Sequence, residues 1–457
     1  MITQAYEAYV PEQSIDGIDA GRRVREDHIR FDLQDDLEFS TRGLESFTFS
    51  RWRPVLFDAM VVAASIEFAD KTVKRPLSGW ARRLNLRIPV HDPRRWAAPA
   101  TSIALHDALG FLTGDFWSIT FIKRRDKASP PAQEPLDLGV PAEAIIAYSE
   151  GMDSRAVAGI LGASLGDRLV RVRVGSNAVD QPCHLGKKEP FATVPYKVKT
   201  HVASRETSAR SRGFKFAMIS GIAAHLAEAR TILVPESGQG SIGPALVAVG
   251  HAYPDYRNHP LFTKRMERFL GALLKQPVRF SFPRIWDTKG ETLRKFSALD
   301  AEGAWKSTRS CWRSSQWVSL NGKRRQCGVC AACMLRRLSV HAAGLREDSD
   351  VYICRDINAA SVREGVDSQF KQFNAAFEQY ALGGVLHLDD LAAMAGLEGR
   401  AAIRRHAVLL APVMDSSVDD IDMKLSELLR RHAIEWNSFV NDLSPQSFVR
   451  KWTRAVL

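Results

Sequence analysis

From residue 142 onwards, short apolar runs alternate with helical patterns, and this alternation restricts the folds that the chain can adopt. Residues 144–148 read AIIAY, a run suited to a buried parallel strand, and the helical pattern RAVAGILGASLG follows the next loop. A second strand is expected at residues 168–174, a helix at 214–229 and another strand at 230–235. Strands that alternate with helices predict an α/β fold with a doubly wound parallel sheet.

Two further regions flank this segment and predict a chain of three parts. Residues 1–139 carry strand-like alternation and a helical pattern, so we expect an added N-terminal α+β domain. The charged, proline-rich residues 123–137 are typical of a linker. Amphipathic stretches predict a C-terminal helical region. The predicted domains are residues 1–139, 140–346 and 347–457. Within the first, the expected elements are strands at 31–39, 84–90 and 116–122 and a helix at 57–68.

The loop SEGMDS, residues 149–154, joins the first of these strands to its helix. Such a loop lies at the carboxyl end of a parallel sheet, where ligands bind, and the following helix N-terminus suits phosphate. Ser149 and Ser154 can donate hydrogen bonds to phosphate oxygens, and Gly151 lets the backbone approach an anion. Asp153 can hold a magnesium ion. The alternative interpretation is an ordinary helix N-cap, for which Ser and Asp are common.

Four cysteines form a cluster with metal-ligand spacing. Cys311 is followed by Cys327, Cys330 and Cys333 in the segment QCGVCAAC. Four converging thiolates make a closed tetrahedral zinc site, which is structural because no position stays open for water. An iron–sulfur cluster is the alternative, since thiolates serve both metals. Five basic side chains flank the site and would offset the thiolate charge: Lys323, Arg324, Arg325, Arg336 and Arg337.

The overall charge and hydropathy indicate which kinds of partner and which location to expect for this protein. The formal net charge is +11, from 63 Lys and Arg against 52 Asp and Glu. This balance indicates either an anionic partner, such as a nucleotide or nucleic acid, or an arginine-rich background composition. No apolar run approaches the ~18 residues that span a bilayer, and no signal peptide is recognisable, so we expect a cytoplasmic protein without a membrane partner.

The loop at residues 149–154 resembles the SGGxDS loop of the PP-loop ATP pyrophosphatase superfamily. Members of that superfamily split ATP between the α and β phosphates and adenylate a substrate. The second position is normally glycine and is Glu150 here. A carboxylate beside the phosphates would repel them unless it faces away or holds a metal.

The loop and the late cysteine quartet together resemble the 7-cyano-7-deazaguanine synthases, the QueC-like proteins. The family's SCxxG…CGxCxxCxxR pattern corresponds to Ser310-Cys311 and residues 327–336, with a longer gap between them. Three intermediate segments match in order, with substitutions: residues 211–216, 253–257 and 286–292. The resemblance covers residues 142–345 and implies a HUP-type, Rossmann-like PP-loop fold for the central domain.

The resemblance implies an ATP-dependent, AMP-forming carbon–nitrogen ligase that acts on 7-carboxy-7-deazaguanine and uses ATP, Mg²⁺ and Zn²⁺. The carboxylate would attack the α-phosphate, ammonia would give an amide, and a second activation would give the nitrile. The resemblance implies a role for each candidate residue. Ser149, Gly151, Asp153 and Ser154 would bind the nucleotide, and Asp153 would also bind magnesium. Arg212 and Lys289 would contact the leaving pyrophosphate, and Asp255 and Arg257 would contact the deazaguanine. The last two residues could instead form a surface ion pair, and Lys289 could be a solvated loop lysine.

In length and layout the chain is similar to the QueC-like members of the bacterial Qat anti-phage operon (QatC). This similarity implies extra domains that recruit a macromolecular acceptor, so that a protein amine captures the acyl adenylate. The alternatives are housekeeping synthesis for queuosine, a tRNA-modifying PP-loop enzyme, and a non-catalytic scaffold in which Glu150 has disabled the loop.

Overall fold

The computed structural model contains two compact units. Unit 1 comprises Met1–Tyr148, Leu165–Val234 and Asp255–Ser281, and unit 2 comprises Ser149–Ser164, Pro235–Pro254 and Phe282–Leu457. The limits of these units differ from the domain boundaries expected at residues 139 and 346, which stay a prediction. The structure describes residues 12–19, 27–39, 53–76, 79, 81–125, 142–174, 191–194, 196–200, 206, 209–249, 253–299, 303–313 and 318–454.

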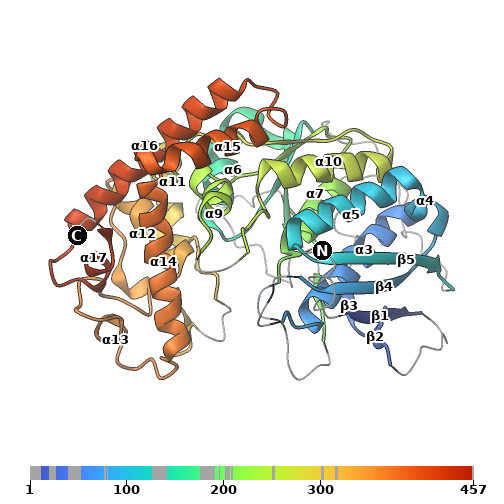
Figure 1. The fold of residues 1–457 in the computed structure, drawn as a ribbon, viewed down its shortest axis with the longest axis horizontal. Helices are drawn as coiled ribbons and strands as arrows, with labels where there is room; N and C mark the ends of the chain where they lie inside the picture. Colours follow the sequence, from blue (N-terminus) through green and yellow to red (C-terminus); the bar gives the residue numbers. More distant parts are fainter. Residues whose placement is uncertain are drawn as a thin grey trace, which may run out of the picture. The chain divides into compact units, whose positions relative to one another are not determined.

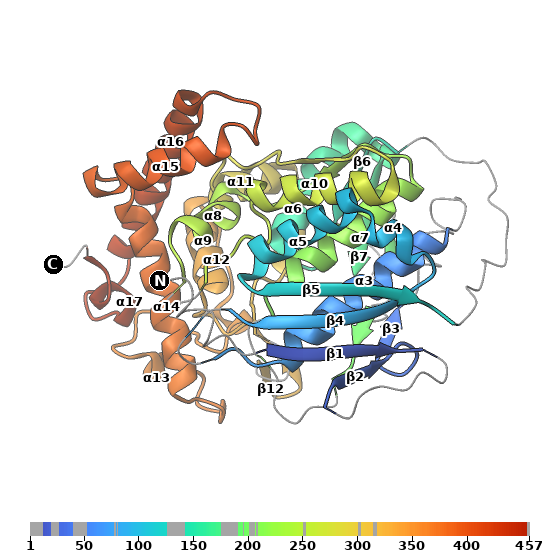
Figure 2. The same cartoon turned by 45° about the vertical axis from the view of Figure 1, so that its right-hand side comes forward.

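Unit 1 contains two sheets whose paired strands are all parallel. Figure 2 shows the strands of the first sheet side by side, in the order β2-β1-β4-β5. The second sheet has the order β11-β10-β6-β7-β8. The strands of the first sheet are β1 (Glu12–Ile18), β2 (Ile29–Asp32), β4 (Arg83–Val90) and β5 (Phe116–Lys123); those of the second are β6 (Ala144–Ala147), β7 (Leu169–Val174), β8 (Phe191–Val194), β10 (Thr231–Leu233) and β11 (Arg279–Ser281).

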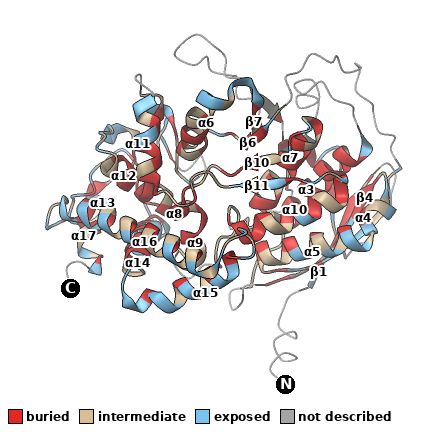
Figure 3. Ribbon diagram, turned by 90° about the horizontal axis from the view of Figure 1, so that it is seen from above, coloured by how far each residue is buried: buried red, intermediate tan, exposed pale blue. Residues whose placement is uncertain are grey.

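Helices of unit 1 pack against both sheets and against one another. Helix α3 (Pro54–Thr72) contacts β4 and α7 (Arg212–Leu226), while α5 (Pro99–Thr113) contacts β5 and α10 (Pro260–Leu274). In turn α7 contacts β6, β7 and β10, and α10 contacts β11, so paired helices separate the two sheets (Figure 3). Figure 1 shows α3, α5, α7 and α10 beside the first sheet. The short helix α4 (Pro93–Ala97) also lies on β5. One apolar cluster includes side chains from both sheets and these helices.

The buried position of α3 explains its composition. Its sequence is apolar on nearly every face, which is typical of a helix enclosed by other elements. Figure 3 shows α3 and α7 largely in the colour of buried residues. The sequence predicted this helix at residues 57–68 and the parallel α/β sheet around β6, and both are present. The first sheet is also parallel, so the N-terminal region repeats the α/β arrangement where we expected α+β.

Local turns account for other differences from expectation. The strand expected at residues 31–39 is divided by a turn into β2 and β3 (Leu37–Phe39), because the Asp36 carboxylate accepts a hydrogen bond from the Asp32 N–H (2.8 Å). Strand β3 pairs antiparallel with β9 (Tyr196–Val198). Strand β5 ends at Lys123, and the predicted linker lies outside the described residues from residue 126 onwards.

Unit 2 is mainly helical, as the amphipathic stretches of the C-terminal region predicted. Helix α12 lies beside α14, and α16 packs against α12, α14 and α15 (Figure 1). One apolar cluster joins the cysteine segment to α14 and α16, and a second joins α6 to α11 and α12. No helix among the described residues has the length and apolarity needed to cross a bilayer. The α-helices are α6 (Met152–Leu165), α8 (Gly238–Ser241), α9 (Gly243–Leu246), α11 (Lys289–Leu299), α12 (Ala331–Ala342), α13 (Val362–Gly365), α14 (Ala375–Ala393), α15 (Arg400–Leu410), α16 (Val418–Asn441) and α17 (Phe448–Lys451).

Short elements complete the fold. Strands β12 (Ser319–Leu320) and β13 (Lys323–Arg324) form an antiparallel hairpin before the three clustered cysteines. Four 3₁₀ turns are described: Gly166–Arg168, Ala304–Ser307, Ser349–Val351 and Leu397–Gly399.

Candidate functional site

The predicted nucleotide loop is held by its own hydroxyl groups. The Ser149 N–H donates to Ser154 Oγ (3.1 Å), and the Gly151 N–H donates to Ser149 Oγ (2.9 Å). The two hydroxyl oxygens are 3.0 Å apart. A Cβ at Gly151 would lie 2.9 Å from Ser149 Oγ, so a side chain there would displace the serine hydroxyl from its present position. Both serines therefore organise the loop, and their contacts with phosphate stay a prediction.

The first turn of α6 contains an acid paired with a distant lysine. The ammonium of Lys289, at the start of α11, forms an ion pair with Oδ2 of Asp153. The lysine side chain is only 8% exposed, which rules out the solvated loop lysine that the sequence left open. Oδ1 of Asp153 is buried and has no hydrogen-bond partner among the described residues. A buried carboxylate oxygen without a partner fits the predicted magnesium ligand, because Mg²⁺ binds oxygen atoms.

Glu150 points toward a basic side chain of the cysteine region. Its carboxylate lies 3.5 Å from Nη1 of Arg324, and both side chains are well exposed. The Glu150 carbonyl accepts a hydrogen bond from the Arg309 N–H (2.7 Å), and Gly151 forms a parallel bridge with Arg309. Thus Glu150 has a cation partner within unit 2. The pair offsets part of the negative charge that replaces the PP-loop glycine, and its exposure limits the effect.

The same backbone contact ties the nucleotide loop to the cysteine segments. The Arg309 guanidinium donates to the carbonyls of Arg324 (3.1 Å) and Arg325 (2.5 Å). The Ser310 N–H donates to Gln326 Oε1 (2.7 Å). The chain entering Cys311 is therefore bonded to the chain entering Cys327, and its residue 309 is also bonded to residues 150–151.

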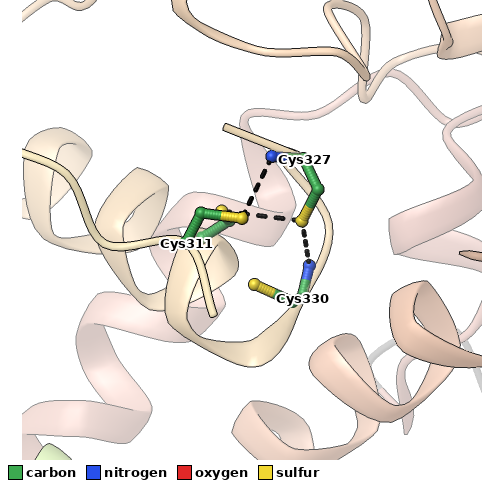
Figure 4. Close-up of side chains that lie close together, drawn as sticks. Cys311, Cys327 and Cys330 are labelled. Atoms are coloured by element: carbon green, nitrogen blue, oxygen red, sulfur yellow. Dashed lines mark hydrogen bonds between the residues drawn. The ribbon is translucent and has the colours of Figure 1, made fainter. Parts of the chain in front are cut away.

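Cys311, Cys327, Cys330 and Cys333 converge as predicted. Their sulfur atoms all lie within 4.8 Å of one another, and Figure 4 shows three of the side chains. The Sγ atoms of Cys327 and Cys333 are 3.7 Å apart, close to the ~3.8 Å spacing of a tetrahedron with ~2.3 Å Zn–S bonds. Two of the sulfurs also accept backbone N–H bonds at 3.3 Å, from Cys327 and Cys330. The donor set fits one zinc ion.

The turn between the first two clustered cysteines needs glycine. Gly328 has φ +84°, and an added Cβ would lie 2.8 Å from the carbonyl oxygen of Cys354. Arg337 donates to the carbonyls of Gly328 (3.1 Å) and Cys354 (2.6 Å). Arg336 is buried and pairs with Glu347 (2.6 Å). The α12 arginines that we expected to offset thiolate charge are therefore engaged by carbonyl groups and a carboxylate.

A second group of predicted residues lies together in unit 1. Arg257 Nε donates to the Asp255 carboxylate (2.7 Å), forming the ion pair that the sequence considered. Arg212 begins α7 with an exposed side chain; partial desolvation and the nearby charge of Arg257 lower the pKa of its guanidinium. Although burial opposes it, Arg257 holds the pKa of Asp255 below its usual value. Two guanidinium groups thus lie near the Asp255 carboxylate, with Glu67 as a further counter-charge for Arg212, and neighbouring cations of this kind favour an added anion.

Gly213 allows this group to form. A Cβ there would lie 2.7 Å from the Cβ and 2.8 Å from the Cα of Arg257, closer than real atoms approach. The start of α7 can therefore touch the backbone of residues 255–257 only because residue 213 has no side chain. This close approach gives a physical reason for the glycine in the segment Ser211–Phe216.

Sequence reasoning missed residues that hold these side chains in place. The Ser211 N–H, one residue before Arg212, donates to Oδ2 of buried Asp70 on α3 (2.7 Å). Asp70 in turn pairs with Arg75 and Arg82. Three acids within a mainly apolar helix, Asp58, Glu67 and Asp70, were the available signal. No comparable pattern marked Gln239, whose Oε1 accepts from the Lys289 N–H (2.7 Å).

The fold and the four-cysteine cluster define a class of protein: an α/β chain with a parallel, Rossmann-like sheet of the PP-loop kind and a site that could hold zinc. Residues 217–344 match the family model described as "Queuosine biosynthesis protein QueC". The match includes Asp255, Arg257, Lys289 and the cysteine quartet, and this region is QueC-like. It excludes residues 149–154 and Arg212 and covers less than a third of the chain. No curated protein matches the chain.

Proposed function

We propose that this chain is an ATP-dependent, AMP-forming ligase that adenylates the carboxylate of a 7-deazaguanine and transfers the acyl group to an amine. The observation that carries the proposal is the pairing of Asp153 with Lys289. It joins a loop of PP-loop character to the QueC-like region, at a carboxylate with one oxygen still available. A magnesium ion would neutralise phosphate charge beside that oxygen.

In the proposed reaction, a carboxylate oxygen of the substrate attacks the α-phosphorus of ATP, and the bond to the bridging oxygen breaks to release pyrophosphate. Lys289 would stabilise the charge that develops on the leaving group, because its ammonium is buried and held by Asp153. The amine nitrogen then attacks the acyl carbon, loses a proton, and AMP leaves. A second activation of the amide would be needed to form a nitrile.

Arg212, Asp255 and Arg257 supply a recognition group in unit 1. The two guanidinium groups suit a carboxylate or pyrophosphate, and the Asp255 carboxylate can accept hydrogen bonds from a purine-like ring. The position of Arg212 supports a role with an anion, since its side chain is exposed and lies near the charge of Arg257, and two neighbouring cations favour an anion between them. We assign pyrophosphate to Arg212 and the deazaguanine to Asp255 and Arg257.

The proposed cofactor of the cysteine quartet is structural zinc, which closes the segment that also holds residues 150–151. All four ligand positions come from the protein, so the metal would organise the loop and not contact substrate. An iron–sulfur cluster would instead favour a tRNA-modifying enzyme, and a metal assay distinguishes the two.

A protein amine is the second candidate acceptor, as in the defence-associated members of the resemblance. It is favoured by the large parts of the chain outside the QueC-like region, namely the first sheet with its helices and helices α14–α17. Free ammonia and housekeeping queuosine synthesis form the alternative. A scaffold without catalysis is the remaining alternative; the Glu150–Arg324 pair argues against it because it places a positive charge beside the Glu150 carboxylate.

The deciding experiment is mass spectrometry of products. Purified chain is incubated with ATP, magnesium and 7-carboxy-7-deazaguanine, with and without ammonia, and with Asp153→Ala as the control. AMP with a deazaguanine amide or nitrile, absent from the control, supports the ligase. AMP without a released product directs the search to a deazaguanine mass on a protein. Absence of AMP from every wild-type reaction would refute the proposal.

A further inference from the structure

The backbone at Lys289 is held by a buried glutamine. Lys289 is the first residue of α11, where the helix leaves its N–H groups without intrahelical partners. The Lys289 N–H donates to Oε1 of Gln239 (2.7 Å), on the short helix α8. Both residues are buried. The position of Lys289 therefore depends on which end of the Gln239 amide faces it.

A histidine of α16 determines the orientation of that amide. His432 is fully buried, and its Nε2 lies 2.9 Å from the carbonyl oxygen of Leu388, which can only accept. Nε2 therefore carries the proton, and Nδ1 accepts from the Gln239 amide nitrogen at 2.8 Å. Burial lowers the pKa of His432 to about 4, so the ring is neutral and keeps this tautomer near pH 7.

The next turn of α16 holds the residue before Lys289. Thr288 and Glu291 form a capping box: the Thr288 N–H donates to Glu291 Oε2 (2.7 Å), and the Glu291 N–H donates to Thr288 Oγ1 (3.1 Å). The Thr288 hydroxyl donates to Oε1 of Glu435 (2.6 Å). Arg431 adds a bond to the Trp286 carbonyl (2.6 Å). Two residues of α16 thus contact the turn that presents Lys289, and His432 reaches it through Gln239.

We propose that α16 positions Lys289: His432, acting through Gln239, and Glu435, acting through Thr288, hold the first turn of α11 so that the lysine ammonium reaches Asp153. These are positioning residues, because none of them lies within the proposed reacting groups. Helix α16 is thereby part of the proposed active site, although it lies outside the QueC-like region.

The hydrogen-bonding chemistry of the Gln239 amide explains how His432 would act on Lys289. If Nδ1 could not accept, the Gln239 nitrogen would lose its hydrogen bond to His432 and keep only the neighbouring Glu435 carboxylate, and turning the amide would bring its oxygen to residue 432. The nitrogen would then face the Lys289 N–H, donor against donor. The first turn of α11 would have to shift to separate them, and the ammonium would move with it.

Two histidine variants distinguish simple packing from the hydrogen-bond chain that runs from His432 through Gln239 to the Lys289 N–H, which we call the relay. In His432→Asn, the side-chain oxygen can occupy the Nδ1 position and still accept from Gln239. In His432→Gln, the amide nitrogen can reproduce the Nε2 donor to Leu388 while the Nδ1 acceptor is lost. Hydrogen–deuterium exchange of residues 286–292 in the full chain reports the Lys289 N–H without depending on activity. Gln239→Leu, similar in size, removes the acceptor directly.

We expect exchange at Lys289 to stay within about twofold of wild type in His432→Asn and to rise roughly tenfold in His432→Gln and Gln239→Leu. Equal acceleration in both histidine variants would overturn the relay, because packing alone would then explain it. Unchanged exchange in Gln239→Leu would also overturn it. In ¹⁵N spectra of labelled histidine, His432 should be neutral and protonated on Nε2 from pH 5.5 to 8; the other tautomer would contradict the assignment.

The catalytic part of the inference rests on the proposed function, and its readout is separate. His432→Gln should lower kcat for AMP formation about tenfold with KM for ATP within twofold, and His432→Asn should recover most of kcat. If His432→Asn lost as much kcat as His432→Gln, the positioning role would be refuted. If wild type forms no AMP, the proposed function fails, while the exchange result still decides the relay.

Discussion

The ammonium of Lys289 and the carboxylate of Asp153 form an ion pair between the first turns of α11 and α6, across 136 residues of sequence. Both side chains are largely buried, so each compensates the charge of the other. The pair places a cation and a carboxylate oxygen without a partner beside the predicted nucleotide loop.

Removing either member should abolish most of the proposed chemistry. We expect Asp153→Asn and Lys289→Met each to reduce AMP formation about 100-fold or more, since each removes charge that would act on the phosphates. Each single variant also leaves a buried charge unpaired and should lose roughly 1–3 kcal/mol of stability. Urea unfolding measures this loss, and the double variant should lose less than the sum. Additive losses would argue against a direct pair.

Glu150 should be dispensable. The Glu150–Arg324 pair is exposed, and such pairs contribute about 0–1 kcal/mol. We therefore expect Glu150→Gly, which restores the common PP-loop residue, to change the Kd for ATP less than threefold. Arg324→Ala should weaken ATP binding more than Glu150→Gly does, because it removes a positive charge beside the loop and keeps the negative charge of Glu150. Isothermal titration measures both; a large gain in affinity for Glu150→Gly would mean that Glu150 repels ATP.

Metal loss should loosen the nucleotide loop. The four thiol groups should hold one zinc ion per chain, measured by elemental analysis, and Cys327→Ser should bind less than a fifth of that amount. Because the Arg309 N–H bonds to the Glu150 carbonyl, zinc removal by a chelator should speed hydrogen exchange at residues 309–311 and 149–152 about tenfold. Iron and sulfide in place of zinc would contradict the assignment.

Gly213→Ala should be destabilising, because the new Cβ would lie 2.8 Å from the Cα of Arg257. Forcing these backbones apart should cost about 1–3 kcal/mol and weaken binding at Asp255 and Arg257. Gly271→Ala is the matched control in α10, since its Cβ would meet nothing within 4 Å and should raise stability by roughly 0.5–1 kcal/mol. Equal effects in thermal unfolding would show that the close approach does not exist.

Glu435 should make stability depend on pH. Burial, followed by repulsion from Glu291, raises its pKa from 4.5 to about 7, while Thr288, Arg294 and Gln239 oppose the shift. Between these values the folded state binds a proton that the unfolded state has released, so stability falls as pH rises from about 4.5 to 7 and levels off above.

Replacing Glu435 by glutamine removes this dependence. Relative to wild type, Glu435→Gln should gain roughly 1–3 kcal/mol between pH 5 and pH 8, measured by urea unfolding. Glu398→Gln, at an exposed position, is the control and should show no such trend. A gain that grows as pH falls would mean that Glu435 is ionised in the folded chain.

Local patterns predicted the elements and the metal cluster well. The apolar run before SEGMDS predicted β6 and α6, because a buried parallel strand and a helix each have a composition visible in a short window. The two-residue spacings of Cys327, Cys330 and Cys333 predicted a metal cluster, since ligands this close must face one another at a turn. The first sheet was less readable: α+β was expected, and parallel pairing of β1 with β2 and β4 was not. Strand alternation does not specify the direction of a partner.

The PP-loop-like segment, the cysteine quartet and the candidate residues could be recognised in the sequence, because each is a local pattern of residue types. Which of these residues contact one another became clear only from the tertiary structure. Packing brings Lys289 to Asp153, Arg324 to Glu150, and His432, through Gln239, to the backbone of Lys289. Such contacts depend on how whole helices and sheets bury their apolar faces, and this property is shared by segments far apart in the chain.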